Sequence, residues 1–210
     1  MTAVDPVRDY PEAWPVEKSD VGFDGAVVRV RTDWVRMPGS DGDELVTRER
    51  VEHPGSVAVV AVDDRDRVLM LRQYRHAVGR QLWEIPAGLR DKAGEPPLAT
   101  ARRELLEEAS YEARRWDTLV DLYTTPGSSN ERVRIFLARD LREVPASEVD
   151  FERVHEEADM PLAWVPLPQA VAAVLSGDVH NALAQVGVLA ASAAHGDAFG
   201  GLRSADAPEE

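Results

Sequence analysis

The sequence has 210 residues and no cysteine, so it suits one large domain, or one domain with a small appendage, and excludes disulfides, thiolate metal sites and cysteine nucleophiles. Its formal charge of −14 disfavours non-specific binding to nucleic acid or to an anionic membrane. Residues 1–20 contain no signal-peptide pattern, no apolar run is long enough for a bilayer, and the lack of cysteine fits a cytoplasmic protein.

The N-terminal part of the chain is predicted to be rich in β-strands. Residues 1–20 form an irregular arm with three prolines, and residues 23–38 and 44–55 then show partial period-two alternation around the turn-like GSDGD. We expect antiparallel strands in an N-terminal subdomain, residues 1–54. Two apolar strands joined by a polar hairpin turn are predicted within residues 56–75, and a short strand at LWEIPAG, residues 82–88.

The first convincing helix is predicted at residues 97–109, where apolar side chains recur at helical spacing. Further strands, and two helices, are predicted in chain order at 116–127, 132–141, 160–177 and 181–195. This mixture predicts an α+β fold with a mostly β core, the main domain being residues 55–195. The small, polar and acidic residues 196–210 are predicted to be a disordered tail.

Three glutamates gather on the predicted helix. At about 100° per residue, Glu107 lies roughly 60° to one side of Glu104 and Glu108 roughly 40° to the other, next to the apolar stripe. Desolvation at that edge raises their mutual repulsion, which hard divalent cations such as Mg²⁺ would relieve. Arg103, four residues before Glu107, is placed to orient it. The alternative is a solvated acidic face balanced by neighbouring arginines.

The segment GLRDKAGEPPLATARRELLEEASY, residues 88–111, resembles the signature of the Nudix hydrolases. In that pattern a glycine and a glutamate precede R-E-U-x-E-E-x-G-U at fixed spacing, where U is a bulky apolar residue. There are three departures: six residues instead of five separate Gly88 from Glu95, Ser110 replaces the usual glycine, and Tyr111 holds an aliphatic position. Serine tolerates positive φ less well than glycine, which puts the shape of the turn after the helix in question.

The resemblance implies a Nudix fold, an α/β/α sandwich with a mixed sheet and a loop–helix–loop metal site. It implies two or three Mg²⁺ or Mn²⁺ ions per site. Their principal ligands would be the carboxylates of Glu104 and Glu108, with Glu107 as a further or water-mediated ligand. The backbone carbonyl of Ala87 would complete the set. Arg103 would hold the carboxylates in register and Glu95 would brace the loop. Nudix enzymes cleave a diphosphate linked to another group.

Two further segments resemble the ADP-ribose pyrophosphatase branch of that family. One is TPGSSNE, with Pro126 sixteen residues beyond Ser110, which alone would be an ordinary turn. The other is LRQYRHAVGRQLWEIPAG. The branch implies substrate contacts by residues near the diphosphate, ribose or metals: Arg75, Glu84, Pro126 and Glu131. The expected reaction yields AMP and ribose 5-phosphate from ADP-ribose. The alternatives are another nucleoside diphosphate sugar or dinucleotide, and a non-catalytic nucleotide sensor.

In this branch the general base comes from a mobile acidic loop after the core strands. The one candidate loop is ERVHEEADMPLAW, where Glu156 and then Glu157 are preferred over Asp159 and His155. Members of the branch also form homodimers in which the N-terminal β segment reaches the partner's site. The strand-rich residues 21–54 are compatible with that arrangement.

Overall fold

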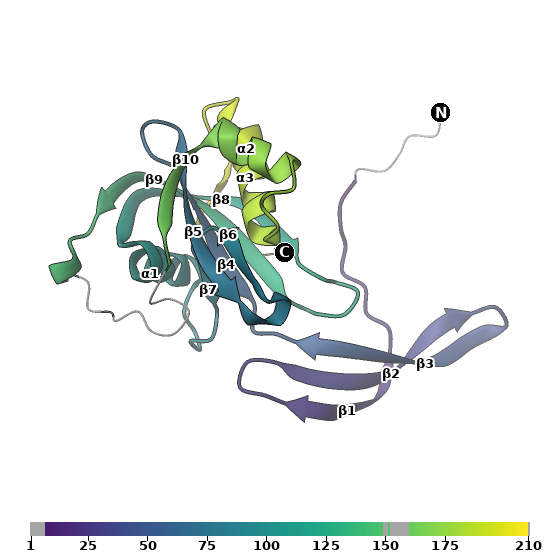
Figure 1. Cartoon of the computed structure of the whole chain (residues 1–210). Helices are drawn as coiled ribbons and strands as arrows, with labels where there is room; N and C mark the ends of the chain where they lie inside the picture. Colours follow the sequence, from purple (N-terminus) through teal and green to yellow (C-terminus); the bar gives the residue numbers. More distant parts are fainter. Residues whose placement is uncertain (1–6, 149–150, 152–159, 210) are drawn as a thin grey trace, which may run out of the picture. The chain divides into compact units, whose positions relative to one another are not determined.

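The computed structural model describes residues 7–148, 151 and 160–209 (Figure 1). Contacts divide the chain into two units. Unit 1 consists of Met1–His53 with the short segment Gly127–Asn130, and unit 2 of Pro54–Pro126 with Glu131–Glu210. Among the described residues no helix is both long and apolar enough to cross a membrane.

Unit 1 is a three-stranded antiparallel sheet in the order β1-β2-β3. Its strands are β1 (Val16–Asp24), β2 (Arg29–Gly39) and β3 (Gly42–Glu52). The sequence predicts an irregular arm over residues 1–20, but β1 begins just after Pro15. Pro15 is the last proline of the arm, and every residue of the arm after it can donate a backbone hydrogen bond to a neighbouring strand. The β2–β3 turn closes through Gly42, whose φ of 123° suits glycine.

Unit 2 contains a five-stranded mixed sheet in the order β11-β8-β9-β4-β7, in which β4 is parallel to β9 and the other pairs are antiparallel. Its strands are β4 (Ser56–Ala61), β7 (Ala87–Leu89), β8 (Tyr111–Tyr123), β9 (Arg132–Glu143) and β11 (Arg203–Ser204). A smaller antiparallel sheet has the order β10-β5-β6. It is built from β5 (Arg67–Arg75), β6 (Arg80–Glu84) and β10 (Leu162–Pro166).

The predicted hairpin at residues 56–75 is realised only in part. A single bridge, Val62 to Val68, joins its two arms, and β5 then pairs with β6 and β10 instead of β4. The predicted strand at LWEIPAG is likewise divided into β6 and β7, because Pro86 interrupts the ladder between them. These breaks let one stretch of chain serve both sheets.

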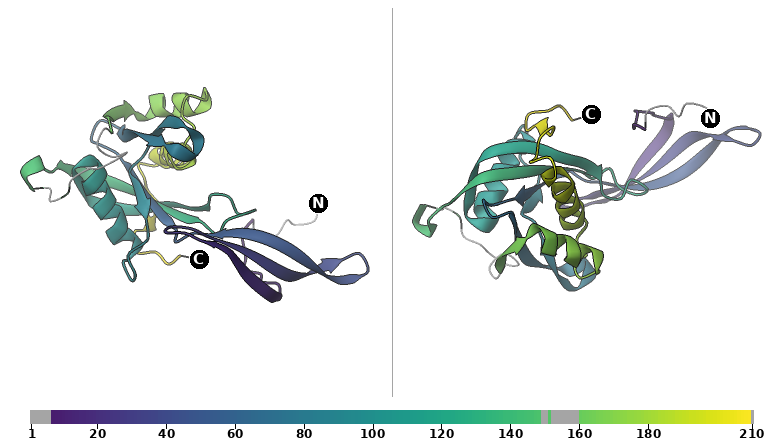
Figure 2. Two further views of the ribbon diagram at one scale, coloured as in Figure 1. Left: turned by 60° about the horizontal axis from the view of Figure 1, so that its bottom comes forward. Right: turned by 90° about the horizontal axis from the view of Figure 1, so that it is seen from above.

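Among the described residues of unit 2, three α-helices cover the sheets: α1 (Pro97–Ala109), α2 (Leu167–Leu175) and α3 (Ala182–His195). Side chains of β4 alternate between two cores, with Val57 and Val59 facing the α1 side and Ala58 and Val60 the α3 side. Figure 2 shows α1 and α3 on opposite faces of the large sheet. The α/β/α sandwich implied by the resemblance is therefore confirmed.

The end of the chain departs from the expectation based on composition. Residues 196–209 are predicted to be disordered, but β11 within them pairs with β8. The side chain of Arg134, on β9 and 2% exposed, donates to the backbone carbonyls of Ala207 and Pro208. A polar segment is thus ordered because it supplies acceptors to a buried guanidinium, a role that composition does not reveal.

Candidate active site

The helix α1 places its glutamates where its helical spacing predicts. Pro97 occupies the first helical position, where its missing N–H costs nothing. Ala101 and Leu105 on the apolar face are fully buried. Beside that face, Glu104 is 9% and Glu108 5% exposed, whereas Glu107 is half-buried. Two carboxylates therefore lie in surroundings that penalise their charge unless a cation is near.

Arg103 gathers the carboxylates. Its Nη1 donates to Glu104 Oε1 at 2.6 Å and to Glu107 Oε2 at 3.0 Å, and its Nη2 donates to Glu95 Oε2 at 3.3 Å. Burial by itself would lower the pKa of Arg103, but the three carboxylates outweigh it and raise that pKa. The hydrogen bond from Arg103, with a second from Thr100, lowers the pKa of Glu95 against the effect of burial. The predicted register and brace contacts of Arg103 and Glu95 are both present.

Strand β7 closes the site on the other side. The backbone N–H of Ala87 donates to Glu108 Oε2 at 2.8 Å. A Cβ on Gly88 would lie 2.1 Å from the carboxyl carbon of Glu104, a distance that no real contact allows. A side chain at position 88 would therefore displace the Glu104 carboxylate, which packs directly on the strand backbone.

The donors fit hard divalent cations in kind, since carboxylates and a strand carbonyl are the ligands that Mg²⁺ and Mn²⁺ prefer. Within the described part of the chain, no three acidic or imidazole side chains already converge as a ready ligand set. Glu104 and Glu107 are turned toward Arg103, and Glu108 toward Ala87. The carboxylates that would hold cations are therefore engaged with Arg103 and Ala87 in this structure.

A second pair comes from the small sheet. Arg75 on β5 and Glu84 on β6 form a two-pronged ion pair, Nε to Oε1 at 2.9 Å and Nη2 to Oε2 at 2.6 Å. Glu84 is 2% exposed, whereas the side chain of Arg75 is 43% exposed. The sequence nominates both residues but does not predict that they bind each other, because the contact depends on the β5–β6 register.

The remaining nominated residues are more scattered. Glu131 accepts hydrogen bonds from Ser56 Oγ at 3.1 Å and from Thr124 Oγ1 at 2.7 Å, at the start of β9. Pro126 is exposed in the preceding turn. Glu156 and Glu157 lie outside the described residues.

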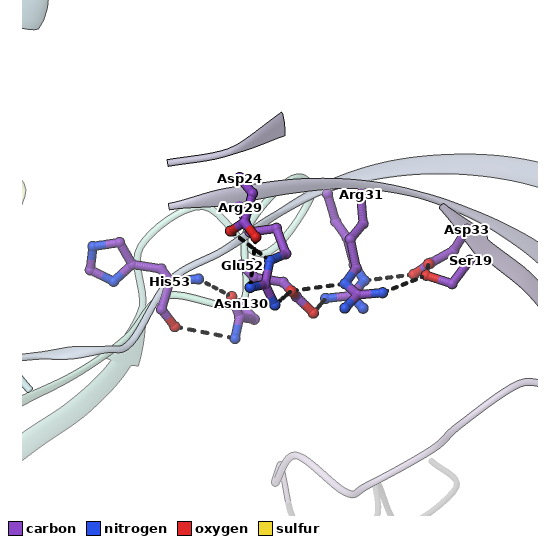
Figure 3. Close-up of polar contacts among 9 residues, drawn as sticks. Ser19, Asp24, Arg29, Arg31, Asp33, Glu52, His53 and Asn130 are labelled. Atoms are coloured by element: carbon purple, nitrogen blue, oxygen red, sulfur yellow. Dashed lines mark hydrogen bonds and ion pairs between the residues drawn. The ribbon is translucent and has the colours of Figure 1, made fainter. Parts of the chain in front are cut away.

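An ion-pair network in unit 1 was not anticipated from the sequence (Figure 3). Arg31 Nε lies 2.8 Å from Glu52 Oε2, Arg50 Nη1 2.9 Å from Glu52 Oε1, and Arg50 Nε 2.6 Å from Asp33 Oδ2. Asp33 is 6% exposed, and hydrogen bonds from Ser19 and then Arg50 lower its pKa. The signal that predicts such a network is the alternation of charged residues along β2 and β3, which places them on one face of the sheet.

The α/β/α sandwich, with an acidic helix entered through a glycine-bearing strand and loop, is the architecture of a Nudix domain. Residues 52–185 match the NUDIX domain model, and the chain belongs to this family of hydrolases, whose members generally use divalent metal ions. The resemblance of residues 88–111 to the family signature is therefore confirmed.

Several relatives within the family are similar to this chain over most of their length. The chain is 53% identical over 169 residues to an ADP-ribose pyrophosphatase of Mycobacterium tuberculosis, covering 80% of this chain and 78% of the relative. It is 36% identical over 160 residues to an ADP-ribose pyrophosphatase of Bacillus subtilis, covering 76% and 82%. A GDP-mannose pyrophosphatase of Citrobacter koseri is 29% identical over 154 residues, covering 67% and 75%.

A solved structure supports the fold independently. The crystal structure of an ADP compounds hydrolase superimposes with a TM-score of 0.69, covering 90% of this chain and 98% of that one, at 19% identity.

Proposed function

We propose that this protein hydrolyses the diphosphate of ADP-ribose to AMP and ribose 5-phosphate, with Mg²⁺ or Mn²⁺ at two or three positions per site. The chemistry rests on one observation, the gathering of Glu95, Glu104 and Glu107 by Arg103 beside the buried Glu108. The substrate rests on the two relatives named for ADP-ribose. We expect the reaction to take place in the cytoplasm.

The residues of the α1 site have separate roles in this proposal. Glu104, Glu107, Glu108 and the carbonyl of Ala87 would hold the cations. When bound, the cations neutralise charge on the diphosphate and lower the pKa of the attacking water. Arg103 would keep the carboxylates aligned as they turn between their present partners and the cations.

The substrate would be held from the small sheet and the turn before β9. Glu84 fixes the plane of the Arg75 guanidinium through two hydrogen bonds, which suits that group to recognise phosphate oxygens. Pro126 and Glu131 would contact the substrate from the turn. Glu156, or else Glu157, would take the proton from the attacking water as general base.

A second candidate keeps the chemistry and changes the substrate. Relatives named GDP-mannose pyrophosphatase, at 27–29% identity, favour another nucleoside diphosphate sugar as the alternative. Dinucleotides share the same diphosphate group. A nucleotide sensor without catalysis is disfavoured because ligand sensing alone does not need the four α1 residues.

The deciding experiment is a substrate panel in which the phosphomonoester products are separated and quantified by chromatography: ADP-ribose, GDP-mannose, other nucleoside diphosphate sugars and NADH, each with Mg²⁺ and with chelator. We expect the highest kcat/KM for ADP-ribose and no turnover with chelator. Clear preference for GDP-mannose or NADH would contradict the substrate assignment.

The same assay tests the metal site through Glu108→Gln. Loss of a group that only hydrogen-bonds to a metal ligand costs about 10–100-fold, so loss of a ligand itself should lower kcat/KM by at least about 100-fold. Glu112→Gln, on the exposed end of β8, is the matched control and should keep wild-type turnover. Unchanged Mg²⁺-dependent hydrolysis in Glu108→Gln would remove the metal-site assignment.

A further inference from the structure

The last residues of the chain form a strap across the large sheet, which we define as residues 203–209 and call the C-terminal strap. It begins as β11 beside β8, passes the side chain of Arg134 on β9, and ends at Arg90, just after β7. Because the sheet order is β11-β8-β9-β4-β7, the strap runs from one edge of the sheet to the other. Figure 2 shows it as the yellow segment that ends at the C-terminus.

Buried polar side chains of the large sheet bind the strap backbone at Ser204, Ala207 and Pro208. Thr118 Oγ1, fully buried, donates to the carbonyl of Ser204 at 2.9 Å. Arg134 donates from Nη1 to the carbonyl of Ala207 at 2.6 Å and from Nη2 to that of Pro208 at 3.1 Å. If the strap left the sheet, these buried donors would lose acceptors, which is costly. The strap is therefore a fixed part of the domain.

Arg134 is itself held rigidly. Asp121 on β8 accepts from Arg134 Nε at 2.7 Å and from Nη2 at 2.9 Å, and also lies 2.9 Å from Arg203 Nη1. The Asp121 carboxylate thus binds two groups: the Arg134 guanidinium, which donates to the strap backbone, and the side chain of Arg203, the first residue of the strap.

The far end of the strap reaches the loop between β7 and α1. Both carboxylate oxygens of Glu209 accept from Arg90 Nη1, at 2.9 and 3.0 Å, and the two side chains are only 22% and 24% exposed. The backbone N–H of Arg90 also donates to the carbonyl of Gly55 at 3.0 Å. Arg90 is the first residue of the loop, residues 90–96, that connects β7 to α1.

The other end of that loop is fixed by Glu95, through Arg103 and Thr100. Between the two fixed ends, residues 91–94 are exposed and belong to no helix or strand. This is also the stretch in which the chain has one residue more than the family signature. A cleft of about 240 Å³ lies between the start of α1 and the strap, and Glu209 forms part of its wall.

We propose that the C-terminal strap fixes the start of the loop between β7 and α1, and that Arg90 and Glu209 are positioning residues for the hydrolysis. The kinetic part of this proposal rests on the proposed function, whereas the effect on the loop does not. The added loop residue gives a physical reason for the second anchor, since a longer exposed segment between β7 and α1 has more conformations to restrict.

The test compares Glu209→Gln with Arg203→Gln, which weakens the opposite end of the same strap. In hydrogen–deuterium exchange, Glu209→Gln should raise the exchange rates of the Arg90 and Glu95 amides by about tenfold, the loss expected for one hydrogen bond between charged groups. These are the amides of the loop whose N–H groups donate to backbone carbonyls, those of Gly55 and Lys92. The same variant should lower kcat and raise the half-saturating Mg²⁺ concentration, each by several fold, with the KM for ADP-ribose little changed. Arg203→Gln should leave loop exchange and kcat as in the wild type.

A double-mutant cycle separates positioning from general destabilisation. Arg90→Met keeps the aliphatic stem of Arg90, and Arg90→Met combined with Glu209→Gln should be no worse than either change alone. Arg90→Lys, which retains the charge, should recover most of the protection of the loop. Wild-type exchange of the Arg90 and Glu95 amides in Glu209→Gln, or an equal rise in Arg203→Gln, would overturn the proposal. If the wild type does not hydrolyse ADP-ribose at all, the proposed function is refuted. The exchange result still decides whether the strap fixes the loop.

Discussion

At the level of single residues, the turn after α1 is where this chain departs most clearly from the Nudix signature. Ser110 has φ 59° and ψ 37°, the left-handed conformation that glycine adopts without strain. Its N–H donates to the carbonyl of Leu106 at 2.9 Å, and its own carbonyl accepts from Val144 N–H at 2.8 Å. The turn therefore keeps its shape with serine, and the cost appears as backbone strain.

Ser110→Gly should relieve that strain. We expect the free energy of unfolding to rise by about 0.5–1 kcal/mol, since the left-handed penalty of about 1–2 kcal/mol is partly offset by greater freedom of glycine in the unfolded chain. Thermal unfolding monitored by circular dichroism measures the change. Ser176→Gly is the control: Ser176 ends α2 with φ −77°, so glycine relieves nothing there and should lower stability. Equal shifts in both variants would contradict the explanation.

The general base is the second residue-scale question, because Glu156 and Glu157 lie outside the described residues. Replacing the acting residue by glutamine should lower kcat by about 100-fold or more, since general-base catalysis contributes roughly 10²–10⁴-fold. Mg²⁺ binding measured by calorimetry should persist, because neither residue is expected to be a principal ligand. Near-normal turnover in both Glu156→Gln and Glu157→Gln would exclude this loop from the reaction.

At the level of elements, the junction of β8, β9 and the C-terminal strap depends on one carboxylate. Burial raises the pKa of Asp121, but hydrogen bonds from Arg134 and Arg203 outweigh it and leave that pKa lowered. A carboxyl with a lower pKa in the folded state binds protons more weakly there than in the unfolded chain. Its contribution to stability is therefore complete above the unfolded pKa of about 3.9 and is lost as the pH falls through the folded value.

Asp121→Asn should consequently cost most at neutral pH. We expect a loss of up to about 3 kcal/mol at pH 7, because the change removes the nearer of the two carboxylates beside the buried Arg134 and leaves Glu209, 4.0 Å away. The difference from the wild type should shrink below about pH 4. Urea unfolding between pH 7 and pH 3 measures both trends. Asp140→Asn removes an exposed ion pair with Arg114 and should show no such dependence. A difference for Asp121→Asn that is constant with pH would refute the role of its charge.

The elements show how far the sequence predicts this structure. Helix α1 has the bounds that its apolar period and the paired prolines predict, and its glutamates lie at the edge of the buried face, since both features are local. The pairing of Arg75 with Glu84 depends on strand register, which no local pattern encodes. The Glu209–Arg90 pair joins residues 119 apart in a segment whose composition indicates disorder. Contacts that depend on topology were the ones that sequence alone could not supply.

At the level of the whole molecule, unit 1 carries apolar side chains that its own sheet does not cover. About half of the surface of each is exposed: Val16, Val21, Phe23, Val27 and Leu45. Three of them lie on β1, and exposed apolar groups gathered in one part of a protein indicate an interaction surface. They support the proposal that two copies of the chain associate through unit 1, as the family branch implies.

Combining Val21→Ser with Phe23→Ser should shift the protein from dimer to monomer. Light scattering coupled to size-exclusion chromatography should give twice the monomer mass for the wild type and the monomer mass for the variant at micromolar concentration. Leu175→Ser, which changes a leucine 74% exposed in unit 2, is the control and should leave the mass unchanged. A wild-type monomer, or a dimer that persists in the double variant, would contradict the proposal.

The chain passes between the two units after His53, again after Pro126, and once more after Asn130. The segment Gly127–Asn130 is bound to β3, since Val51 N–H donates to the carbonyl of Ser128 at 2.8 Å and His53 N–H donates to the side chain of Asn130 at 2.8 Å. A protease that cuts only after His53 would thus leave unit 1 attached through that segment. For the same reason, unit 1 cannot be grafted onto another Nudix domain as a simple N-terminal cassette; a working chimaera must carry Gly127–Asn130 with it.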